Sequence, residues 1–478
     1  MSISVVDSTL AWAGAAALAR LIRDGRVDEV ELTQFFLDRI ARLNPGLNAY
    51  CTVDAGGALK AADTARMRRL AGEPLGCLHG IPVSIKDLID TAGLRTTYGS
   101  TLFRDHVPTR DAVSVSRLRA AGAIVLGKTN TAEFEGGGNT VNPVFGATRN
   151  PWDTNLSVGG SSGGSGAAVA AGLSPLSLGT DLGGSLRIPA SFCGVMGLRP
   201  TPGLVPVWPV DMAYDTFGTE SPIAAKVDDL ALALDVLAGA EQGVPLSAAA
   251  SSAPYRDAAA EESISGLRVA VSANLGLMTV EPEIADVVAC AAARLGPAVA
   301  SIDSRTPDWV GGDRVVNVYR QLRMATKHGA KLPEHRSELR PSLVSNIEGG
   351  LALSGADIAQ ADRERQRLIE EASRFFTTHD VLVAAVTPVL PFPVEQDFPR
   401  RIAGKEVTDY TAWLHLTYVP ATLGLPALAM PAGFSSAGLP IGLQLIGAWR
   451  SERKLLAVAA LLERELADVV ARRPDAVR

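Results

Sequence analysis

The spacing of apolar residues predicts a helical segment at the start of the chain. Over residues 1–70 apolar positions recur at helical intervals, and residues 10–23 indicate a first amphipathic helix, not a signal peptide, because no positively charged region precedes them. Asp28 stands where an N-cap is expected for a second helix over residues 30–43. Asn44-Pro45-Gly46 is typical of the end of such a helix.

Between residues 78 and 200 the pattern changes to alternating strands and helices. Residues 81–85 alternate their apolar side chains as a strand does. Asp111 is placed to cap a helix that Gly122 would end, and residues 123–126 follow as a buried strand. Such alternation is typical of an α/β core.

The second half of the chain combines further strands with a long polar helical part. Residues 241–262 are rich in Ala, Ser and Glu and predict a surface connection. Residues 315–376 are polar and helical, and the charged run at 362–367 fits a solvated helix face better than a partner site. Apolar runs predict core strands at residues 267–271, 380–385 and 443–446, and a closing helix at 451–472.

The composition excludes several classes of protein. The 478 residues are 47% hydrophobic, which allows a large core and rules out a disordered chain. The net charge of −6 leaves no basic surplus for a nucleic-acid partner, and no apolar run is long enough to predict a membrane span. Four cysteines without a C-x-x-C pair indicate a reducing, cytoplasmic environment, and the histidines lack the spacing of a metal site.

Glycines concentrate between Gly159 and Gly166, directly before the apolar residues 167–171. A flexible linker does not explain this run, so the pattern predicts a tight loop that leads into a helix N-terminus. A phosphate-binding P-loop would need a lysine that the sequence lacks here. A nucleophile elbow around Ser161 fits the G-x-S-x-G pattern but needs a histidine base. The candidates for that base are His328, His335, His379 and His415.

Two further residues stand at strand ends, where hydrolytic chemistry is often placed. Ser185 follows a predicted strand at residues 176–180, and the N–H groups of residues 182–185 can converge as an oxyanion hole. A capping serine in a glycine turn is the alternative. Lys86 closes an apolar strand, where burial would lower its pKa and leave a neutral amine able to act as a base. An ion pair with Asp87 or another carboxylate, or extension of the amine to water, is the alternative.

Taken together, these segments resemble the amidase signature family of serine hydrolases. The resemblance covers nearly the whole chain and is carried by residues 80–87, 127–130, 150–153, 159–165, 179–187, 189–194 and 197–201. It implies an α/β fold, in which a mixed, twisted sheet of roughly eleven strands is covered by helices on both faces. It also implies a single amidase domain over residues 1–478. Its parts would be an N-terminal helical region (1–70), a signature core (71–240), a surface connection (241–265) and a C-terminal part that completes the sheet (266–478).

The resemblance also implies a Ser-cisSer-Lys triad. Ser185 would be the nucleophile, and Ser161, after a cis peptide bond from Gly160, would connect it to a neutral Lys86. Ser185 would form an acyl-enzyme that water then hydrolyses. The oxyanion would be held by the N–H groups of Leu182, Gly183, Gly184 and Ser185, with support from Ser162, Thr180, Asp181 and Arg187. No metal or organic cofactor is implied.

The expected function is hydrolysis of an amide, with esters and carbamates as further substrates. The alternative is the A subunit of a tRNA-dependent amidotransferase, which acts as a glutaminase with partner subunits. A non-catalytic binding protein on this fold would be expected to lack a triad residue, and none is missing. The expected partners are a small amide and water, and the resemblance favours a homodimer. Loops near 133–145, 205–220 and 310–345 are expected to form the walls of the substrate pocket.

Overall fold

A mixed sheet of eleven strands organises the chain. The computed structural model describes residues 8–408 and 410–475, so the first seven residues of the expected helical region lie outside it. The strand order is β1-β3-β2-β6-β8-β7-β14-β15-β11-β9-β10. The strands are β1 Tyr50–Val53, β2 Pro82–Lys86, β3 Ile124–Thr129, β6 Leu176–Asp181, β7 Met196–Arg199, β8 Thr219–Ala224, β9 Arg268–Val271, β10 Ser301–Ser304, β11 Val381–Ala385, β14 Ala427–Phe434 and β15 Pro440–Gly447. Two small hairpins pair β4 Val141–Asn142 with β5 Gly146–Ala147, and β12 Arg401–Ile402 with β13 Lys405–Glu406.

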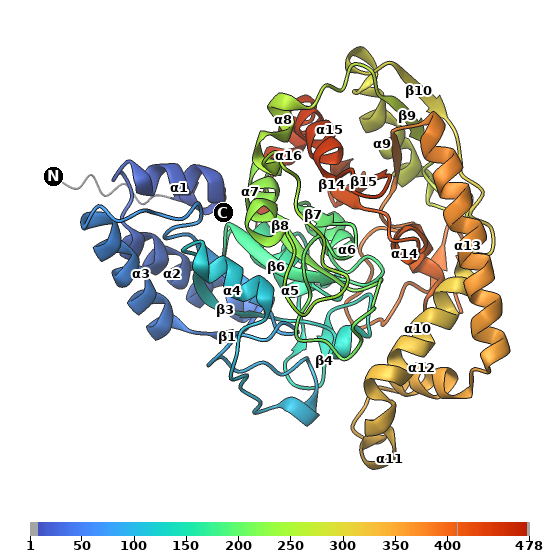
Figure 1. The fold of residues 1–478 in the computed structure, drawn as a ribbon, viewed down its shortest axis with the longest axis horizontal. Helices are drawn as coiled ribbons and strands as arrows, with labels where there is room; N and C mark the ends of the chain where they lie inside the picture. Colours follow the sequence, from blue (N-terminus) through green and yellow to red (C-terminus); the bar gives the residue numbers. More distant parts are fainter. Residues whose placement is uncertain (1–7, 409, 476–478) are drawn as a thin grey trace.

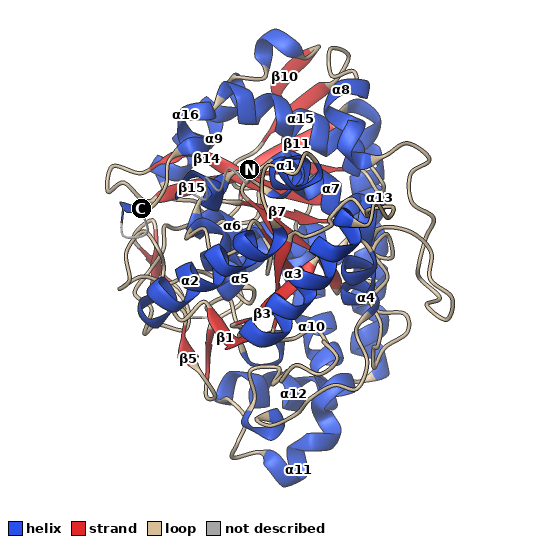
Figure 2. Ribbon diagram, turned by 90° about the vertical axis from the view of Figure 1, so that its left-hand side faces the viewer, coloured by secondary structure: helices blue, strands red, loops and turns tan. Residues whose placement is uncertain are grey.

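Helices pack against both faces of this sheet (Figure 2), which confirms the expected single α/β domain. They are α1 Ala15–Arg23, α2 Glu29–Leu47, α3 Ala55–Leu70, α4 Val113–Ala120, α5 Gly163–Ala170, α6 Arg187–Cys193, α7 Val227–Leu237, α8 Ala258–Glu261, α9 Pro282–Ala293, α10 Gly312–His328, α11 Leu332–His335, α12 Pro341–Ala352, α13 Gly355–Thr378, α14 His415–Thr422, α15 Glu452–Glu465 and α16 Ala467–Ala471. Figure 1 shows α1–α3 at one end of the molecule and α10, α12 and α13 at the other.

Two parallel strand pairs place the candidate site. Strand β2 pairs in parallel with both β3 and β6, so the carboxyl ends of β2 and β6 lie at the same edge of the sheet. Lys86 is the last residue of β2, and Asp181 is the last residue of β6. Strand β8 then runs antiparallel to β6 and places Glu220 opposite Thr180.

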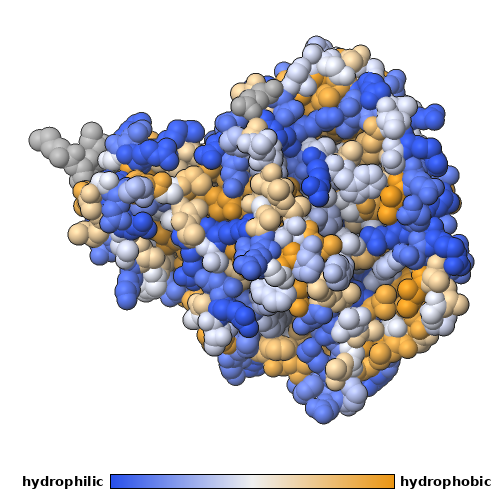
Figure 3. All heavy atoms as spheres, in the orientation of Figure 1, coloured by the Kyte–Doolittle hydropathy of each residue, from blue (hydrophilic) through white to orange (hydrophobic). Residues whose placement is uncertain are grey.

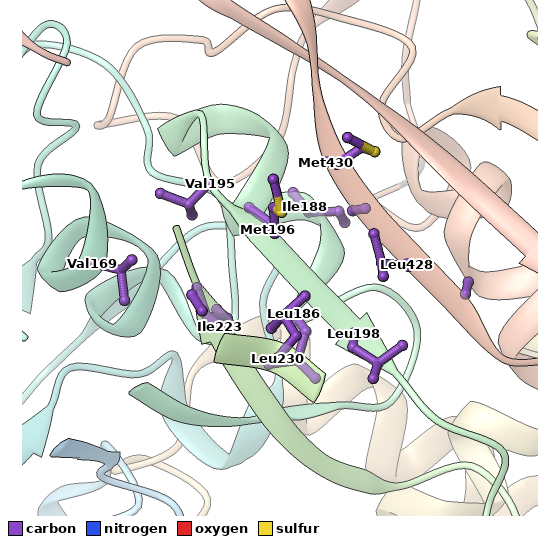
Figure 4. Close-up of a cluster of buried hydrophobic side chains, with 14 of the residues drawn as sticks. Val169, Leu186, Ile188, Val195, Met196, Leu198, Ile223, Leu230, Leu428 and Met430 are labelled. Atoms are coloured by element: carbon purple, nitrogen blue, oxygen red, sulfur yellow. The ribbon is translucent and has the colours of Figure 1, made fainter. Parts of the chain in front are cut away.

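The core beside this edge is apolar and closely packed. Figure 4 shows Ile188 of α6, Met196 of β7 and Leu428 of β14 in one cluster, and all three side chains are buried. Helix α6 contacts β7, β14 and β15 through such residues. Burial of this apolar surface is the main contribution to stability. It fixes the start of α6, which directly follows the loop with Ser185.

Two predictions for residues 1–70 are wrong, namely the end of the second helix and the wholly helical character of this region. Helix α2 does not stop before Asn44 but continues through Pro45 to Leu47, where Asn48 adopts a left-handed conformation. Pro45 removes one helical hydrogen bond, and the helix ends two residues after it. Residues 1–70 are also not wholly helical, because they contain β1. The N-cap at Asp28 is confirmed, since its carboxylate accepts hydrogen bonds from the N–H groups of Val30 and Glu31.

Asp111 does not cap the helix that follows it. The N-cap of α4 is Ala112, while the Asp111 carboxylate accepts a hydrogen bond from the Ala92 N–H at 2.7 Å and pairs with Arg119 at 3.2 Å. The charged side chain is thus used to hold the preceding loop. Gly122 does follow the helix, with a positive φ of 91°.

The expected connection and the charged helix face are both visible. Residues 241–254 contain no helix or strand, but Tyr255 and Ala258 are buried, so the connection is only partly at the surface. The run at residues 362–367 lies on α13. Asp362, Arg363 and Gln366 are exposed and the other three residues are half-buried, so the expectation of a solvated helix face is met only in part. In Figure 3 hydrophilic residues dominate the right-hand edge, where Figure 1 places α13. No helix of the described residues is long and apolar enough to cross a membrane.

Candidate active site

Lys86 is a fully buried amine at the end of β2. Its Nζ donates hydrogen bonds to Ser161 Oγ and to Thr180 Oγ1, each at 2.7 Å. Burial lowers the pKa of Lys86 to about 7, although the carboxylates of Glu135, Asp181 and Glu220 oppose the shift. A large fraction of this amine is therefore neutral at physiological pH, as a general base requires.

The two alternatives for Lys86 do not hold in the structure. The Asp87 carboxylate does not pair with Lys86 but accepts hydrogen bonds from the Thr97 N–H at 3.1 Å and the Thr97 hydroxyl at 2.5 Å. The amine also does not extend to water, because Lys86 is 0% exposed. The reason is the position of β2 between β3 and β6, with every residue of the strand buried.

Ser161 lies in the loop before α5, after a cis peptide bond from Gly160. The next residue, Ser162, ties this loop to its neighbours. Its hydroxyl donates to the Thr180 carbonyl at 3.0 Å, and its N–H donates to the Ser185 carbonyl at 3.2 Å. The described residues show no hydrogen bond between the Ser161 and Ser185 hydroxyls, so Ser185 is held beside Ser161 through Ser162. Hydrogen bonds of this kind are often loose without substrate.

The histidine base of a nucleophile elbow is not present at Ser161. Its hydroxyl accepts from Lys86, and no histidine in the described part of the chain hydrogen-bonds to it. His328 stacks on Phe134 with ring centroids 4.4 Å apart, and His335 pairs with Glu338 near the surface. The structure therefore does not support the elbow interpretation, because the group that hydrogen-bonds to this serine is the Lys86 amine.

Ser185 follows two glycines that no larger residue could replace without displacing α14. A Cβ at Gly183 would lie 2.5 Å from the ring of Tyr418, and a Cβ at Gly184 would collide with the Thr417 hydroxyl. Gly184 also has a φ of 127°, which side chains disfavour. The Thr417 hydroxyl in turn donates to the Gly183 carbonyl at 2.7 Å. Close contact with α14 thus sets the shape of the loop, and Ser185 is 9% exposed.

One of the four expected oxyanion donors is already in use. The Gly184 N–H donates to Asp181 Oδ1 at 2.8 Å, so it is not available to a substrate, and its assignment is corrected. Among the described residues, the N–H groups of Leu182, Gly183 and Ser185 donate to no protein acceptor. These three remain the candidates.

Asp181 forms a buried ionic cluster beneath the loop. Its carboxylate pairs with Arg187 at 3.1 Å and with Arg199 at 3.2 Å, and all three side chains are fully buried. Burial alone would raise the pKa of Asp181, but the two guanidinium groups hold it well below its usual range. The same carboxylate accepts hydrogen bonds from the N–H groups of Gly184 and Leu186. A single charged side chain therefore anchors both ends of the Ser185 segment.

A cavity of about 380 Å³ reaches the site at Thr180. All three segments expected to form pocket walls contribute to it, although the third is a helix, α10, and not a loop. The sequence analysis did not single out the charged residues of the wall, which are Asp90, Glu135, Asp211, Asp215, Glu220, Arg323, Lys327 and Lys331. They come from separate segments, so no local motif marks them. The described residues contain no group of side chains able to hold a metal ion.

Comparison with known proteins shows the family of the chain. A profile of the Amidase family matches residues 31–456. The chain is 36% identical to an acylamidase of Rhodococcus erythropolis over 464 residues, which cover 96% of each chain. It is 37% identical over 485 residues to the A subunit of the glutamyl-tRNA(Gln) amidotransferase of Roseiflexus sp. (strain RS-1), covering 94% of this chain and 96% of the other. The structure superimposes on that of a bacterial aryl acylamidase of the amidase signature family with a TM-score of 0.91 and 27% identity, covering 98% of this chain and 100% of the other.

The fold, the site and these similarities define a hydrolase that acts on carbon–nitrogen amide bonds. The chain belongs to the amidase signature family.

Proposed function

We propose that the protein is an amidohydrolase in which Ser185, Ser161 and Lys86 act together through an acyl-enzyme. The observation that carries the proposal is the 2.7 Å hydrogen bond between the buried Lys86 amine and the Ser161 hydroxyl. An amine with a pKa near 7 can accept a proton at neutral pH and return it later in the reaction.

The proton moves in a closed cycle. Ser185 Oγ attacks the amide carbon while its proton passes to Ser161, whose own proton passes to Lys86. When the carbon–nitrogen bond breaks, Lys86 returns the proton through Ser161 to the departing nitrogen, which leaves as a neutral amine. Water then attacks the acyl-enzyme by the same route and releases the acid. Two hydroxyl groups and one amine thus do the work of a histidine base.

The negative charge on the carbonyl oxygen is stabilised by backbone N–H groups. We assign this role to Leu182, Gly183 and Ser185, while the Gly184 N–H serves Asp181. Removal of one preorganised donor of this kind lowers the rate about 10²–10³-fold. Thr180 and Ser162 are positioning residues, since they hold Lys86 and the loops in place.

The substrate class that the similarities favour is an N-acyl amine, because two of the relatives are named acylamidases. Esters and carbamates share the carbonyl chemistry and belong in the same assay panel. Replacing Ser185 by Ala should abolish turnover of every substrate, whereas Ser265→Ala, at an exposed serine, should not change it. A fluorophosphonate should label Ser185, as located by peptide mass. Labelling of Ser161 instead, or turnover by S185A, would contradict the proposal.

A second function is favoured by the 37% identity with the A subunit of an amidotransferase. That function predicts release of ammonia from glutamine, dependent on partner subunits. The purified chain alone, given glutamine and an aryl amide in parallel, separates the two functions. Hydrolysis of the aryl amide with no activity on glutamine supports a free-standing amidase. Light scattering in the same buffer tests the expected homodimer.

A further inference from the structure

The cavity reaches the candidate active site at Thr180, next to Lys86, the base of the proposed mechanism. It touches Thr180, whose hydroxyl accepts from the Lys86 amine at 2.7 Å. In the proposed mechanism the departing nitrogen takes its proton from Ser161 and Lys86, so the amine half of the substrate lies on their side of the carbonyl. The cavity of about 380 Å³ is large compared with an engineered cavity of about 150 Å³ that binds benzene. It has room for an amine with one or two rings.

Two of the three cations in the cavity wall are paired with carboxylates. The third, Lys331, donates a hydrogen bond to the Lys327 carbonyl at 3.1 Å and has no anionic partner among the described residues. Arg323 pairs with Asp215 at 2.7 Å and with Glu135 at 3.4 Å, and Lys327 pairs with Glu135 at 3.6 Å. Burial, with the nearby cations, lowers the pKa of His328 to about 3, so its ring is neutral. A carboxylate on a ligand would therefore find Arg323 and Lys327 occupied. Among the described lining residues, only Lys331 would be open to it, and the carboxylates of Asp90 and Asp211 line the same cavity.

The remaining polar groups of the wall make the cavity unfavourable for an anion. Asp90 accepts a hydrogen bond from the Tyr98 hydroxyl at 2.6 Å and has no cationic partner among the described residues. Glu220 accepts a hydrogen bond from the Ser114 hydroxyl, and burial raises its pKa to about 7. A ligand anion placed here would face the carboxylates of Asp90 and Asp211, with Lys331 as the one unpaired cation of the described lining residues.

Apolar side chains complete the wall and give it a defined shape. They include Phe103, Phe134, Val207 and Met212. Phe134 and its neighbour Glu135 have positive φ angles of 45° and 64°. Two consecutive side chains in this conformation are strained, and such strain concentrates at functional sites. It places the Phe134 ring against His328 and the Glu135 carboxylate against Arg323.

We propose that this cavity holds the amine half of the substrate, as an uncharged, largely apolar group such as an arylalkyl or aryl amine. The inference rests on the proposed amidohydrolase function and assigns a place and a chemical class to its leaving group. The enzyme is then expected to discriminate between substrates by their amine half more than by their acyl group. Substrates with an anionic amine half are disfavoured.

The first experiment varies the amine and keeps the acyl group constant. The acyl group is the one hydrolysed fastest in the Ser185 panel, and the amines are ammonia, benzylamine, 4-carboxybenzylamine and 4-(aminomethyl)benzylamine. The expected kcat/KM of the benzyl amide exceeds that of the carboxybenzyl amide by at least about tenfold. Preference for the carboxylate or for the second ammonium group would overturn the assignment of an uncharged group.

The second experiment narrows the cavity. Val207 is half-buried and lines the cavity, whereas Tyr214, on the same loop, is 73% exposed and does not. In Val207→Trp, the kcat/KM of the benzyl amide relative to the primary amide should fall by at least about tenfold. Tyr214→Trp introduces the same side chain outside the cavity and should leave the ratio unchanged. An unchanged ratio in Val207→Trp, or sensitivity to the acyl group instead, would overturn the inference.

The two proposals fail in different ways. Suppose that the wild type hydrolyses amides and Ser185→Ala does not, while kcat/KM is the same for every amine in the series. In that case the amine assignment is wrong and the hydrolase mechanism stands. If Ser185→Ala retains turnover, the mechanism itself is wrong. Should Val207→Trp not fold, the amine series with the wild-type protein still decides the question.

Discussion

The hydroxyl of Thr180 should set the pH range in which the enzyme works. Thr180 accepts one of the two hydrogen bonds of the Lys86 amine. Replacing it by Val keeps the shape and removes this acceptor. The ammonium form of Lys86 depends on the acceptor more than the neutral form does, so its pKa should fall. Because the neutral amine is the base, activity rises with pH through this pKa. The acidic limb of the pH profile should therefore move to lower pH.

The size of the shift follows from the hydrogen bond that is lost. A bond from a charged donor contributes about 1.5–3 kcal/mol, and one between neutral groups about 0.5–1.5 kcal/mol. The ammonium form loses about 1–1.5 kcal/mol more than the amine, which corresponds to about one pH unit. The limb expected near pH 7 in the wild type should then lie near pH 6 in Thr180→Val.

The measurement is kcat/KM for a small primary amide as a function of pH, which reports the free enzyme. The rate of inactivation by a small fluorophosphonate gives the same limb without occupying the cavity. Thr180→Ser keeps the hydroxyl and should restore the wild-type limb. The reasoning is refuted if Val leaves the limb in place or moves it to higher pH, or if Ser and Val move it equally.

Three further predictions concern stability and the loop. Lys86→Met should stabilise the fold at pH 7 while abolishing activity. The folded pKa of Lys86 is lowered from 10.5 to about 7, so the unfolded chain binds more protons between these values and wild-type stability rises with pH there. The penalty removed is at most about 5 kcal/mol, and urea unfolding at pH 7 and 9.5 would show a flatter dependence in the variant. Gly183→Ala should lower kcat at least about 100-fold by contact with Tyr418, and Tyr418→Ala in the same chain should recover part of the labelling by a fluorophosphonate; no recovery would argue against that contact. Asp181→Asn should destabilise the protein by about 3–5 kcal/mol, whereas Asp63→Asn, in an exposed pair, should change stability by less than about 1 kcal/mol; equal effects would contradict the role of burial.

The features that the sequence analysis predicted correctly are those encoded by neighbouring residues. The glycine loop before α5 and the strands that end near Lys86 and Thr180 follow from local apolar runs and glycines. The cap at Asp28 likewise needs only its own turn of helix. At Asp111 the same reasoning fails, because an arginine two turns later and the N–H of Ala92 compete for the carboxylate. A capping signal predicts a helix start only when no tertiary partner attracts the side chain.

The ionic wall of the cavity could not be predicted in this way. Arg323 lies 108 residues from Asp215 and 188 residues from Glu135. None of these residues has a motif around it, and a charged side chain on a polar helix normally predicts exposure. Their pairing is a consequence of how the sheet brings distant segments together. The hydrogen bond from the Gly184 N–H to Asp181 could not be predicted either. The sequence does not show which donors bind to a buried carboxylate.

The Asp181 carboxylate holds the Ser185 segment on its buried side, away from the side that meets substrate. It accepts hydrogen bonds from two backbone N–H groups of the segment and pairs with two arginines. Most residues lining the cavity come from other parts of the chain. Thr219 does contact Asp181, but its hydroxyl donates to the Asp181 backbone carbonyl and not to the carboxylate. Mutations of cavity residues other than Thr180 can thus accumulate without disturbing bond cleavage. Such a separation would let one ancestral catalyst diversify toward many amines, and it offers protein engineers a region in which to retarget the enzyme.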